Sequence, residues 1–148
     1  MITTPDGVIS EVWDCIAGYD LTGKILCHCS GSLSSNVFSG IEQTGAVGCS
    51  IHPMYAFSDR FTSYQNFSTA YLVAEGMPAA YEPLAQMFRE LGHTVLYLQA
   101  ENKVKYHAAA AMVSNDMIAL FQTVLDLLEQ CGFCLLYTSP SPRDMRRS

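Results

Sequence analysis

Polar side chains capable of proton transfer or ligand binding interrupt an alanine-rich stretch, "KVKYHAAAAMVSN", at residues 103–115. Lys103, His107 and Asn115 are separated by multiples of four residues, so a helix would place them on one edge, with Ser114 in the same arc. An ammonium, an imidazole and an amide on one edge could bind a small polar substrate. The alternative is structural: a solvated lysine, a core histidine and an asparagine bonded to a neighbouring loop.

Polar residues also end three of the predicted strands, in "ITTPD", "CHCSG" and "SIHP". In an open α/β sheet, ligands bind outside the carboxyl ends of the strands, where backbone N–H groups are exposed. If these strands are neighbours, their ends line one crevice. The residues at the strand ends are Thr4, Pro5 and Asp6, then His28, Ser30 and Gly31, and then His52.

Metal and thiol chemistry are weaker interpretations. His28, His52 and His107 could converge, but none has a partner at the spacing of a zinc motif, so no metal is predicted. A metal-dependent protein remains the third alternative. Cys27 and Cys29 share one strand face and His28 faces the other, and no base for a cysteine nucleophile is identifiable.

The elements that must position these residues alternate along the chain. Apolar residues at helical spacing predict a first helix, with Asp6 as its cap. Strand-helix-strand units then predict the later half of a doubly wound α/β sheet, largely parallel. The predicted helices are 8–17, a short one within 32–45, 79–92 and 102–130, and the predicted strands lie within 22–31, 46–53, 69–76 and 93–100.

Composition limits the class of protein. The chain has 148 residues, 49% of them hydrophobic and 15% charged, which is typical of a folded globular protein. Fourteen acidic side chains against eight basic ones give a net charge of −6, which disfavours nucleic-acid binding. No transmembrane segment or signal peptide is predicted, so we expect a soluble cytoplasmic protein with reduced cysteines.

The two ends of the chain suggest further boundaries. The stretch 102–130 is apolar over a wide arc, so it should open a helical domain or form a homodimer interface. Residues 134–148 resemble a translated sequencing adapter and are predicted not to be native. The expected domains are a partial Rossmann-like domain at 1–101, the start of a helical domain at 102–133, and this tail.

The combined motifs "TTPD", "HCSG", "SIHPM" and "KVKYHAAAAMVSN" resemble a family of Rossmann-like proteins. Their C-terminal part is the domain of unknown function 2520, and they are distantly related to prephenate dehydrogenases and pyrroline-carboxylate reductases. Family members begin with a G-x-G-x-x-G nucleotide-binding turn. Because the ten glycines here never occur as G-x-G, the resemblance implies that the first strands are missing.

The resemblance also implies roles for individual residues. His52 would be the acid or base that contacts the reacting group, assisted by Ser30, while Lys103 and His107 stand at the catalytic end of the inter-domain helix. The β-hydroxyacid dehydrogenases carry a catalytic lysine at the place of Lys103 and an asparagine where this chain has His107. The remaining implied contacts are Thr4, Pro5, Asp6, His28 and Gly31 with an NAD or NADP cofactor, and Ser114 and Asn115 with substrate.

The leading hypothesis is a fragment of an NAD(P)-dependent oxidoreductase that acts on a small hydroxy, oxo or imino acid. The nicotinamide would exchange a hydride, and the protein would orient the substrate and exchange a proton. The alternative is a non-catalytic Rossmann-like module that binds a nucleotide or metabolite. The expected partner is a small molecule, with no nucleic acid and no membrane.

Overall fold

The computed structural model describes residues 1–133 apart from residues 56, 58 and 60. The tail predicted not to be native, residues 134–148, lies outside the described residues. The chain divides into two compact units, 1–108 and 109–148, and each is described by itself. The first unit contains the sheet, and the second contains most of the long helix.

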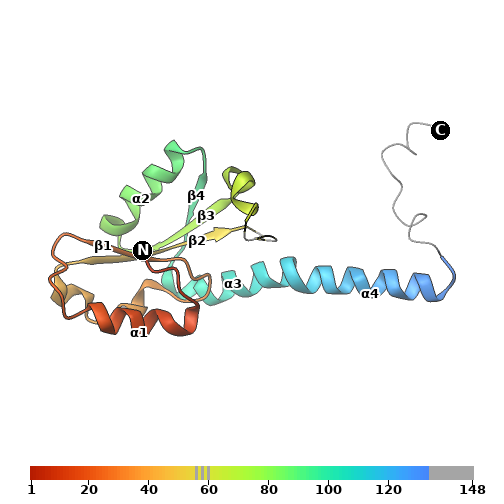
Figure 1. Ribbon diagram of the computed structural model, residues 1–148, viewed down its shortest axis with the longest axis horizontal. Coiled ribbons are helices and arrows are strands. Elements are labelled where there is room, and N and C mark those ends of the chain that lie inside the picture. Colours follow the sequence, from red (N-terminus) through yellow and green to blue (C-terminus); the bar gives the residue numbers. More distant parts are fainter. Residues whose placement is uncertain (56, 58, 60, 134–148) are drawn as a thin grey trace. The chain divides into compact units, whose positions relative to one another are not determined.

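The first unit is built on a four-stranded sheet in the order β1-β2-β3-β4 (Figure 1). Strands β1 and β2 are parallel, as are β3 and β4, and Ile2 adds a parallel bridge to His28 at the outer side of β1. The predicted α/β class is therefore confirmed. The strands are Ile25–His28, Val47–Met54, Tyr71–Gly76 and Thr94–Tyr97.

The central pair, β2 and β3, runs antiparallel, which the strand-helix-strand pattern did not predict. The connection between these strands contains the short 3-10 helix η3, Ser63–Thr69, and no α-helix among its described residues. A parallel connection normally needs a crossover helix, and β3 and β4 have one in α2, Pro78–Glu90. Between β1 and β2, the predicted short helix is two 3-10 helices, η1 (Ser35–Val37) and η2 (Ile41–Thr44).

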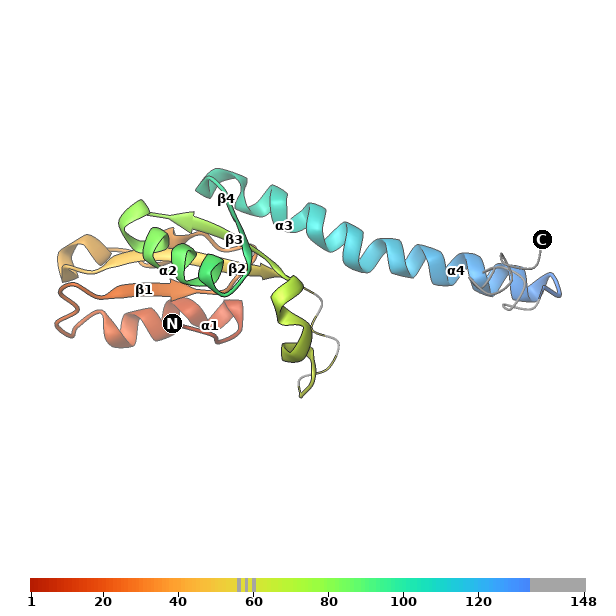
Figure 2. The same cartoon turned by 90° about the horizontal axis from the view of Figure 1, so that it is seen from above.

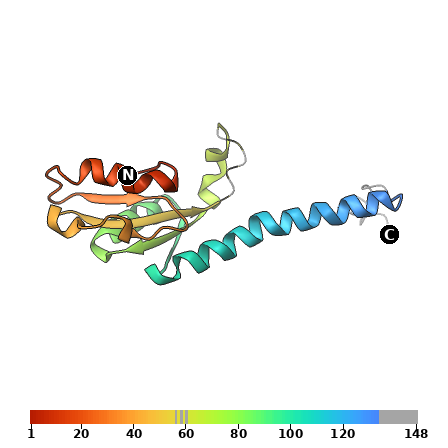
Figure 3. The same cartoon turned by 90° about the horizontal axis from the view of Figure 1, so that it is seen from below.

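The two faces of the sheet carry separate cores. One face packs against α2, and the other packs against α1, Asp6–Ile16, so the helices lie on opposite sides of the strands (Figures 1 to 3). Alternation along each strand assigns the side chains to these faces. The α2 side contains Cys27, Cys49, Ile51, Leu72 and Ala74, and the α1 side contains Ile9, Trp13, Leu26 and Phe38.

The start of α1 differs from the prediction. Pro5 occupies the N-cap position and Asp6 is the first helical residue, with no side-chain capping bond. The carboxylate of Asp6 instead accepts hydrogen bonds from Ser30 and Ser32. Asp6 is thus used to hold the loop after β1, and the prediction that it caps the helix was wrong.

The long helix predicted over 102–130 is confirmed, with one irregular turn. It runs as α3 (Lys103–Ala111), a π-helical turn η5 (Met112–Asp116) and α4 (Met117–Gln130), and ends where Gly132 takes a φ of 85°. Its apolar side chains in the second unit are exposed, among them Ile118, Leu120 and Phe121. By length and composition, 100–130 could cross a membrane, a test that core helices of soluble proteins also pass.

We predict that Gly76→Ala destabilises the first unit strongly. Gly76 has a φ of 123°, and a Cβ there would lie 2.7 Å from both the Cα of Cys49 and the carbonyl oxygen of Gly48. Backbone strain and a clash with backbone atoms together should cost about 2–4 kcal/mol of unfolding free energy. Chemical denaturation followed by circular dichroism measures the loss.

Gly92→Ala is the matched control, because Gly92 also has a positive φ, 91°, but its Cβ would meet open space. This variant should lose only the conformational part, about 1 kcal/mol. Equal losses in the two variants would contradict the close approach of β3 to β2 at Gly76.

Candidate functional site

The three predicted strand ends meet at one edge of the sheet. Ile2 and β2 flank β1 on opposite sides, both in parallel, so the chain leaves all three at the same edge. The Oγ of Ser30 donates a hydrogen bond to Asp6 Oδ2 at 2.7 Å, and the Oγ of Ser32 donates to the same oxygen at 2.9 Å. The predicted crevice residues from 4–6, 30–31 and 52 are therefore neighbours.

The hydrogen bonds from Ser30 and Ser32 favour the ionised form of Asp6. Partial burial by itself raises the pKa of its carboxyl, but the hydrogen bonds from Ser30 and Ser32 outweigh that effect and the net pKa is lowered. The side chains of Thr4, Pro5 and Asp6 are exposed at this edge. They are accessible to a ligand, as their predicted role requires.

Two imidazoles converge on Gly31. A Cβ at this buried glycine would lie 2.5 Å from His107 Nδ1 and 2.9 Å from His52 Nε2. The two rings meet edge to face, with 6.1 Å between their centroids. Sequence positions 52 and 107 thus contribute to one site, and the absence of a side chain at position 31 leaves room for both rings.

Tyr106 completes this group, and the sequence analysis did not select it. Its hydroxyl lies 2.8 Å from His52 Nδ1. Burial, with smaller effects from Lys103 and His107, lowers the pKa of His52 to about 4, and burial raises the pKa of Tyr106. At neutral pH, the imidazole of His52 is therefore uncharged and the phenol is protonated. Helical spacing could not reveal this contact, because its partner is 54 residues away.

His28 holds the loop that carries Gly31. Its ring is completely buried, and its Nδ1 accepts a hydrogen bond from the Ser30 amide at 3.2 Å. Nε2 then carries the proton of the neutral ring and donates to the Ser34 carbonyl at 3.2 Å. Burial lowers the pKa of His28, which favours this neutral form. Both nitrogens are engaged by the backbone, so the geometry does not fit the predicted cofactor contact.

Lys103 supports the same loop from the helix. Its side chain is 1% exposed, and its Nζ donates a hydrogen bond to the Ser30 carbonyl oxygen at 2.8 Å. Burial lowers the pKa of this ammonium, while the charges of Glu75 and Asp6 act in the opposite direction. The lysine predicted to be catalytic is thus buried beneath the loop, where it contacts backbone and not an open cleft.

Glu75 is a second residue that the sequence analysis missed. It is 2% exposed, and its carboxylate accepts hydrogen bonds from the Ser35 amide and hydroxyl, both at 2.8 Å, and from the Ser50 hydroxyl at 2.9 Å. In the strand register, His28 is paired with Ser50, and Ser50 with Glu75. An acidic residue inside the apolar strand "YLVAEG" was the available signal for this buried polar row.

Ser114 and Asn115, predicted to bind substrate, belong to the second unit. Both are exposed and lie in the π-helical turn η5, where Ser114 Oγ donates to the Ala111 carbonyl at 3.4 Å. Turns of this kind are rare in proteins, and those that occur are frequently located at functional sites. The role of Ser114 and Asn115 in substrate binding stays a prediction.

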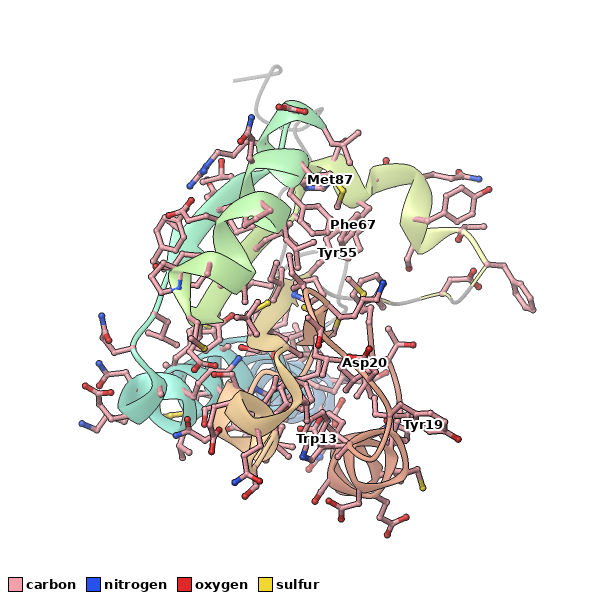
Figure 4. All side chains as sticks on the ribbon, turned by 90° about the vertical axis from the view of Figure 1, so that its left-hand side faces the viewer. Trp13, Tyr19, Asp20, Tyr55, Phe67 and Met87 are labelled. Carbon is pink, nitrogen blue, oxygen red and sulfur yellow. The ribbon has the colours of Figure 1, made fainter. Side chains whose placement is uncertain are left out.

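In the part of the chain that the structure describes, neither a surface hollow nor a metal-ligand cluster competes with the site at Gly31. A hollow of about 770 Å³ lies between the end of α1 and the loop before β2, at the opposite edge of the sheet from His52, and Trp13, Tyr19 and Asp20 line it (Figure 4). Within residues 1–133 as described, no three His, Cys, Asp or Glu side chains gather as metal ligands would. The imidazole pair at Gly31 is therefore the better candidate for chemistry.

The residues fit only one end of a dinucleotide. Thr4, Pro5 and Asp6 are exposed and border the edge at which Gly31 lies, whereas Gly31 itself is buried against the rings of His52 and His107. A phosphate-binding turn of the G-x-G-x-x-G type is absent from the sequence. This chain could therefore contact a nicotinamide and its ribose, while other residues would have to hold the phosphates.

We predict that His52 makes the stability of the first unit depend on pH. Its pKa is about 4 in the folded state and about 6.5 in an unfolded chain. Between these values the unfolded state binds the extra proton, so unfolding free energy falls as the pH decreases from 7 towards 4. From pH 7 to 4.5, wild type should lose about 1–2 kcal/mol more than His52→Gln, measured by urea denaturation.

The comparison reports His52 together with its charge interactions with Lys103, His107 and Asp6, which are present in both proteins. His28 titrates in both proteins, and Asp6 changes its charge below its ordinary pKa of 3.8. A constant difference between the two stability curves over this pH range would contradict the burial of a neutral His52.

We also predict that Glu75→Gln loosens the loop after β1. The new amide group would face a donor from Ser35 or Ser50, so one hydrogen bond is replaced by a clash of donors, costing about 1–3 kcal/mol. Hydrogen exchange of the Ser35 amide should accelerate. Glu90→Gln, at an exposed position on α2, is the control and should leave that exchange rate unchanged; equal rates in all three proteins would contradict the anchoring role of Glu75.

Comparison with known proteins supports the fold. The family described as "Domain of unknown function (DUF2520)" matches residues 70–140. No curated protein matches the chain. The protein TM1727 from Thermotoga maritima superposes with a TM-score of 0.72 at 26% identity, over 89% of this chain and 49% of that protein.

Two further structures share the fold at lower identity. A candidate NADP oxidoreductase, BF3122 from Bacteroides fragilis, has a TM-score of 0.61 at 21% identity, with coverage of 88% of this chain and 49% of that one. An imine reductase variant from Myxococcus stipitatus, solved in complex with NAD+, has a TM-score of 0.57 at 18% identity, with coverage of 86% and 46%. The chain spans about half the length of each of these structures.

These findings confirm the resemblance inferred from sequence motifs. The mixed sheet and the long helix are those of Rossmann-like proteins, and the structures that share this fold include a candidate NADP oxidoreductase and an imine reductase. Residues 70–140 match the family model DUF2520, and the chain shares the fold of Rossmann-like proteins.

Proposed function

We propose that this chain is the later part of a nicotinamide-dependent oxidoreductase that acts on a small hydroxy, oxo or imino acid. The observation that carries the proposal is the convergence of His52 Nε2 and His107 Nδ1 on Gly31, at the edge where parallel strands end. This is the edge at which α/β proteins bind their ligands. Two neighbouring imidazoles are suited to hydrogen bonding and proton exchange with a substrate.

The cofactor is proposed to be NAD or NADP. The support comes from the fold shared with a candidate NADP oxidoreductase and with an imine reductase solved with NAD+. When bound, the nicotinamide would donate or accept the hydride. The residues of this chain would orient the substrate, exclude water from one side and exchange the proton.

Lys103 and His28 have a supporting part in this proposal. Their hydrogen bonds to the Ser30 carbonyl, the Ser30 amide and the Ser34 carbonyl hold the loop that brings Gly31 to the imidazoles. Within the first unit, the proposed direct contacts with substrate are therefore limited to His52 and His107. Ser114 and Asn115 are retained as proposed substrate contacts from the second unit.

A homodimer through 102–130 is also proposed for the complete protein. The exposed apolar side chains of α4, including Leu120, Phe121 and Leu127, support further burial of this helix, since such a surface is costly in water. A soluble, cytoplasmic location is proposed on the same basis as the oxidoreductase function.

The test uses this chain extended by any in-frame coding sequence found upstream of Met1, called the longer polypeptide below. Oxidation of NADH or NADPH is followed with a panel of 2-oxo acids and cyclic imines. His52→Gln should reduce kcat/KM by about 10²–10⁴-fold, because a positioned donor or acid is lost, while cofactor affinity stays within about two-fold.

His93→Gln is the control, because His93 bonds to the Ala70 carbonyl in a separate aromatic cluster and should retain activity per folded molecule. Cofactor binding without turnover of any substrate by the unmutated protein would reject the enzyme and favour the metabolite-binding module.

A further inference from the structure

The hydrogen bond between Tyr106 and His52 has a preferred direction. A neutral imidazole nitrogen is a far stronger base than a phenol oxygen, and a phenol is a stronger acid than an imidazole N–H. The Tyr106 hydroxyl therefore donates to His52 Nδ1 across their 2.8 Å contact. The ring proton of His52 is then on Nε2, the nitrogen that faces Gly31.

The reverse direction would leave a phenol proton without a partner. Among the described residues, His52 is the hydrogen-bond partner of the Tyr106 hydroxyl, and that hydroxyl is partly buried. If His52 Nδ1 donated instead, the phenol proton would need another acceptor, and Nε2 would present a lone pair to Gly31. Satisfaction of polar groups thus agrees with the acid-base argument.

His107 differs from His52 in its surroundings. Its side chain is exposed, and neither ring nitrogen has a hydrogen-bond partner among the residues that the structure describes. Its Nδ1 is nevertheless directed at the position beside Gly31 that His52 Nε2 also approaches. A proton bound by His107 can exchange with water, which the more enclosed His52 ring allows less readily.

We infer that Tyr106 fixes His52 as an Nε2–H donor, that His107 is the proton acceptor, and that the pair recognises a hydroxyl or carbonyl oxygen. This deepens the proposed function and rests on it for the reaction. An oxygen has the lone pair that the His52 N–H requires, whereas a protonated imine nitrogen has none. Tyr106 is a positioning residue in this scheme, since it acts through His52.

The proton and electron balance is simple in the oxidative direction. The substrate O–H bond breaks and its proton passes to His107 Nδ1, while the carbon-bound hydrogen leaves as hydride, with two electrons, to the oxidised nicotinamide of the proposed function. The C–O single bond becomes a C=O bond, whose oxygen keeps the hydrogen bond from His52. Reduction of a carbonyl reverses each of these changes.

The titration of His52 agrees with a donor that stays neutral. Burial and the neighbouring charges of Lys103 and His107 lower its pKa to about 4, and Asp6 opposes this only in part. A ring with so low a pKa is a poor proton acceptor at neutral pH. It can still donate its Nε2–H without becoming charged.

The first experiment determines the tautomer of His52 in the chain as it exists. With ¹⁵N-labelled histidine, long-range ¹H–¹⁵N correlation spectra at pH 7 distinguish a protonated ring nitrogen from an unprotonated one. The expected result is a protonated Nε2 and an unprotonated Nδ1 in His52. An Nδ1–H tautomer would overturn the inference, because the pair would then offer two acceptors to the ligand.

Tyr106→Phe tests the positioning role in the same spectra. Without the phenol donor, His52 should shift to a mixture of tautomers, while Tyr64→Phe, at an exposed position on η3, should keep the wild-type spectrum. An unchanged Nε2–H tautomer in Tyr106→Phe would remove Tyr106 from the scheme. If this variant does not fold, the wild-type spectrum alone still decides the direction of the bond.

The division of roles is tested in the longer polypeptide by pH profiles of kcat/KM for alcohol oxidation. His107→Gln should remove the pH dependence of the rate, because the proton acceptor is lost, whereas His52→Gln should lower the rate about 10²-fold or more and keep that pH dependence. The opposite pattern would make His52 the base. Absence of all turnover would reject the proposed function and the role of His107, while the tautomer measurement would stand.

Discussion

The loop between β1 and η1 depends on polar groups that are buried below it. Lys103 and Glu75 are almost completely inaccessible, and a buried ammonium or carboxylate is costly unless hydrogen bonds and opposite charges compensate for lost water. Both side chains find their partners in this loop or next to it: the Ser30 carbonyl for Lys103, and Ser35 and Ser50 for Glu75. The loop therefore has few alternative conformations in which these charges remain satisfied.

The position of Gly31 follows from that constraint. With the loop held at Ser30 and Ser35, the intervening glycine is brought against the rings of His52 and His107, where any Cβ would collide. The contact needs the parallel pairing of β1 and β2 as well, since it places the ends of both strands at one edge. Sheet pairing, buried charge and a missing side chain together produce one imidazole pair.

The shared fold and the local chemistry carry different information about function. Likeness to oxidoreductases at or below about one quarter identity indicates the architecture, and imine reductases are among the structures that share it. The tyrosine-histidine contact is a property of this chain. The proposed preference for an oxygen substrate rests on Tyr106, His52 and His107, and not on the fold.

The sequence by itself determined the order and type of the elements, because alternation in strands and the helical period are local patterns. It also placed Ser30, Gly31 and His52 at one edge of the sheet, and His107 among the polar residues at the start of the long helix. It could not assign Asp6, which bonds to the loop after β1 instead of capping α1, or the antiparallel direction of β3.

Tertiary structure decided which polar groups meet. The bonds from Tyr106 to His52, from Lys103 to Ser30 and from Ser35 to Glu75 join residues 54, 73 and 40 positions apart. Local sequence patterns do not reveal contacts between residues so far apart in the chain, because such contacts depend on strand pairing and loop closure over the whole unit. For that reason the buried role of Lys103 and His28, and the presence of Tyr106 and Glu75 in the site, emerged only from the folded chain.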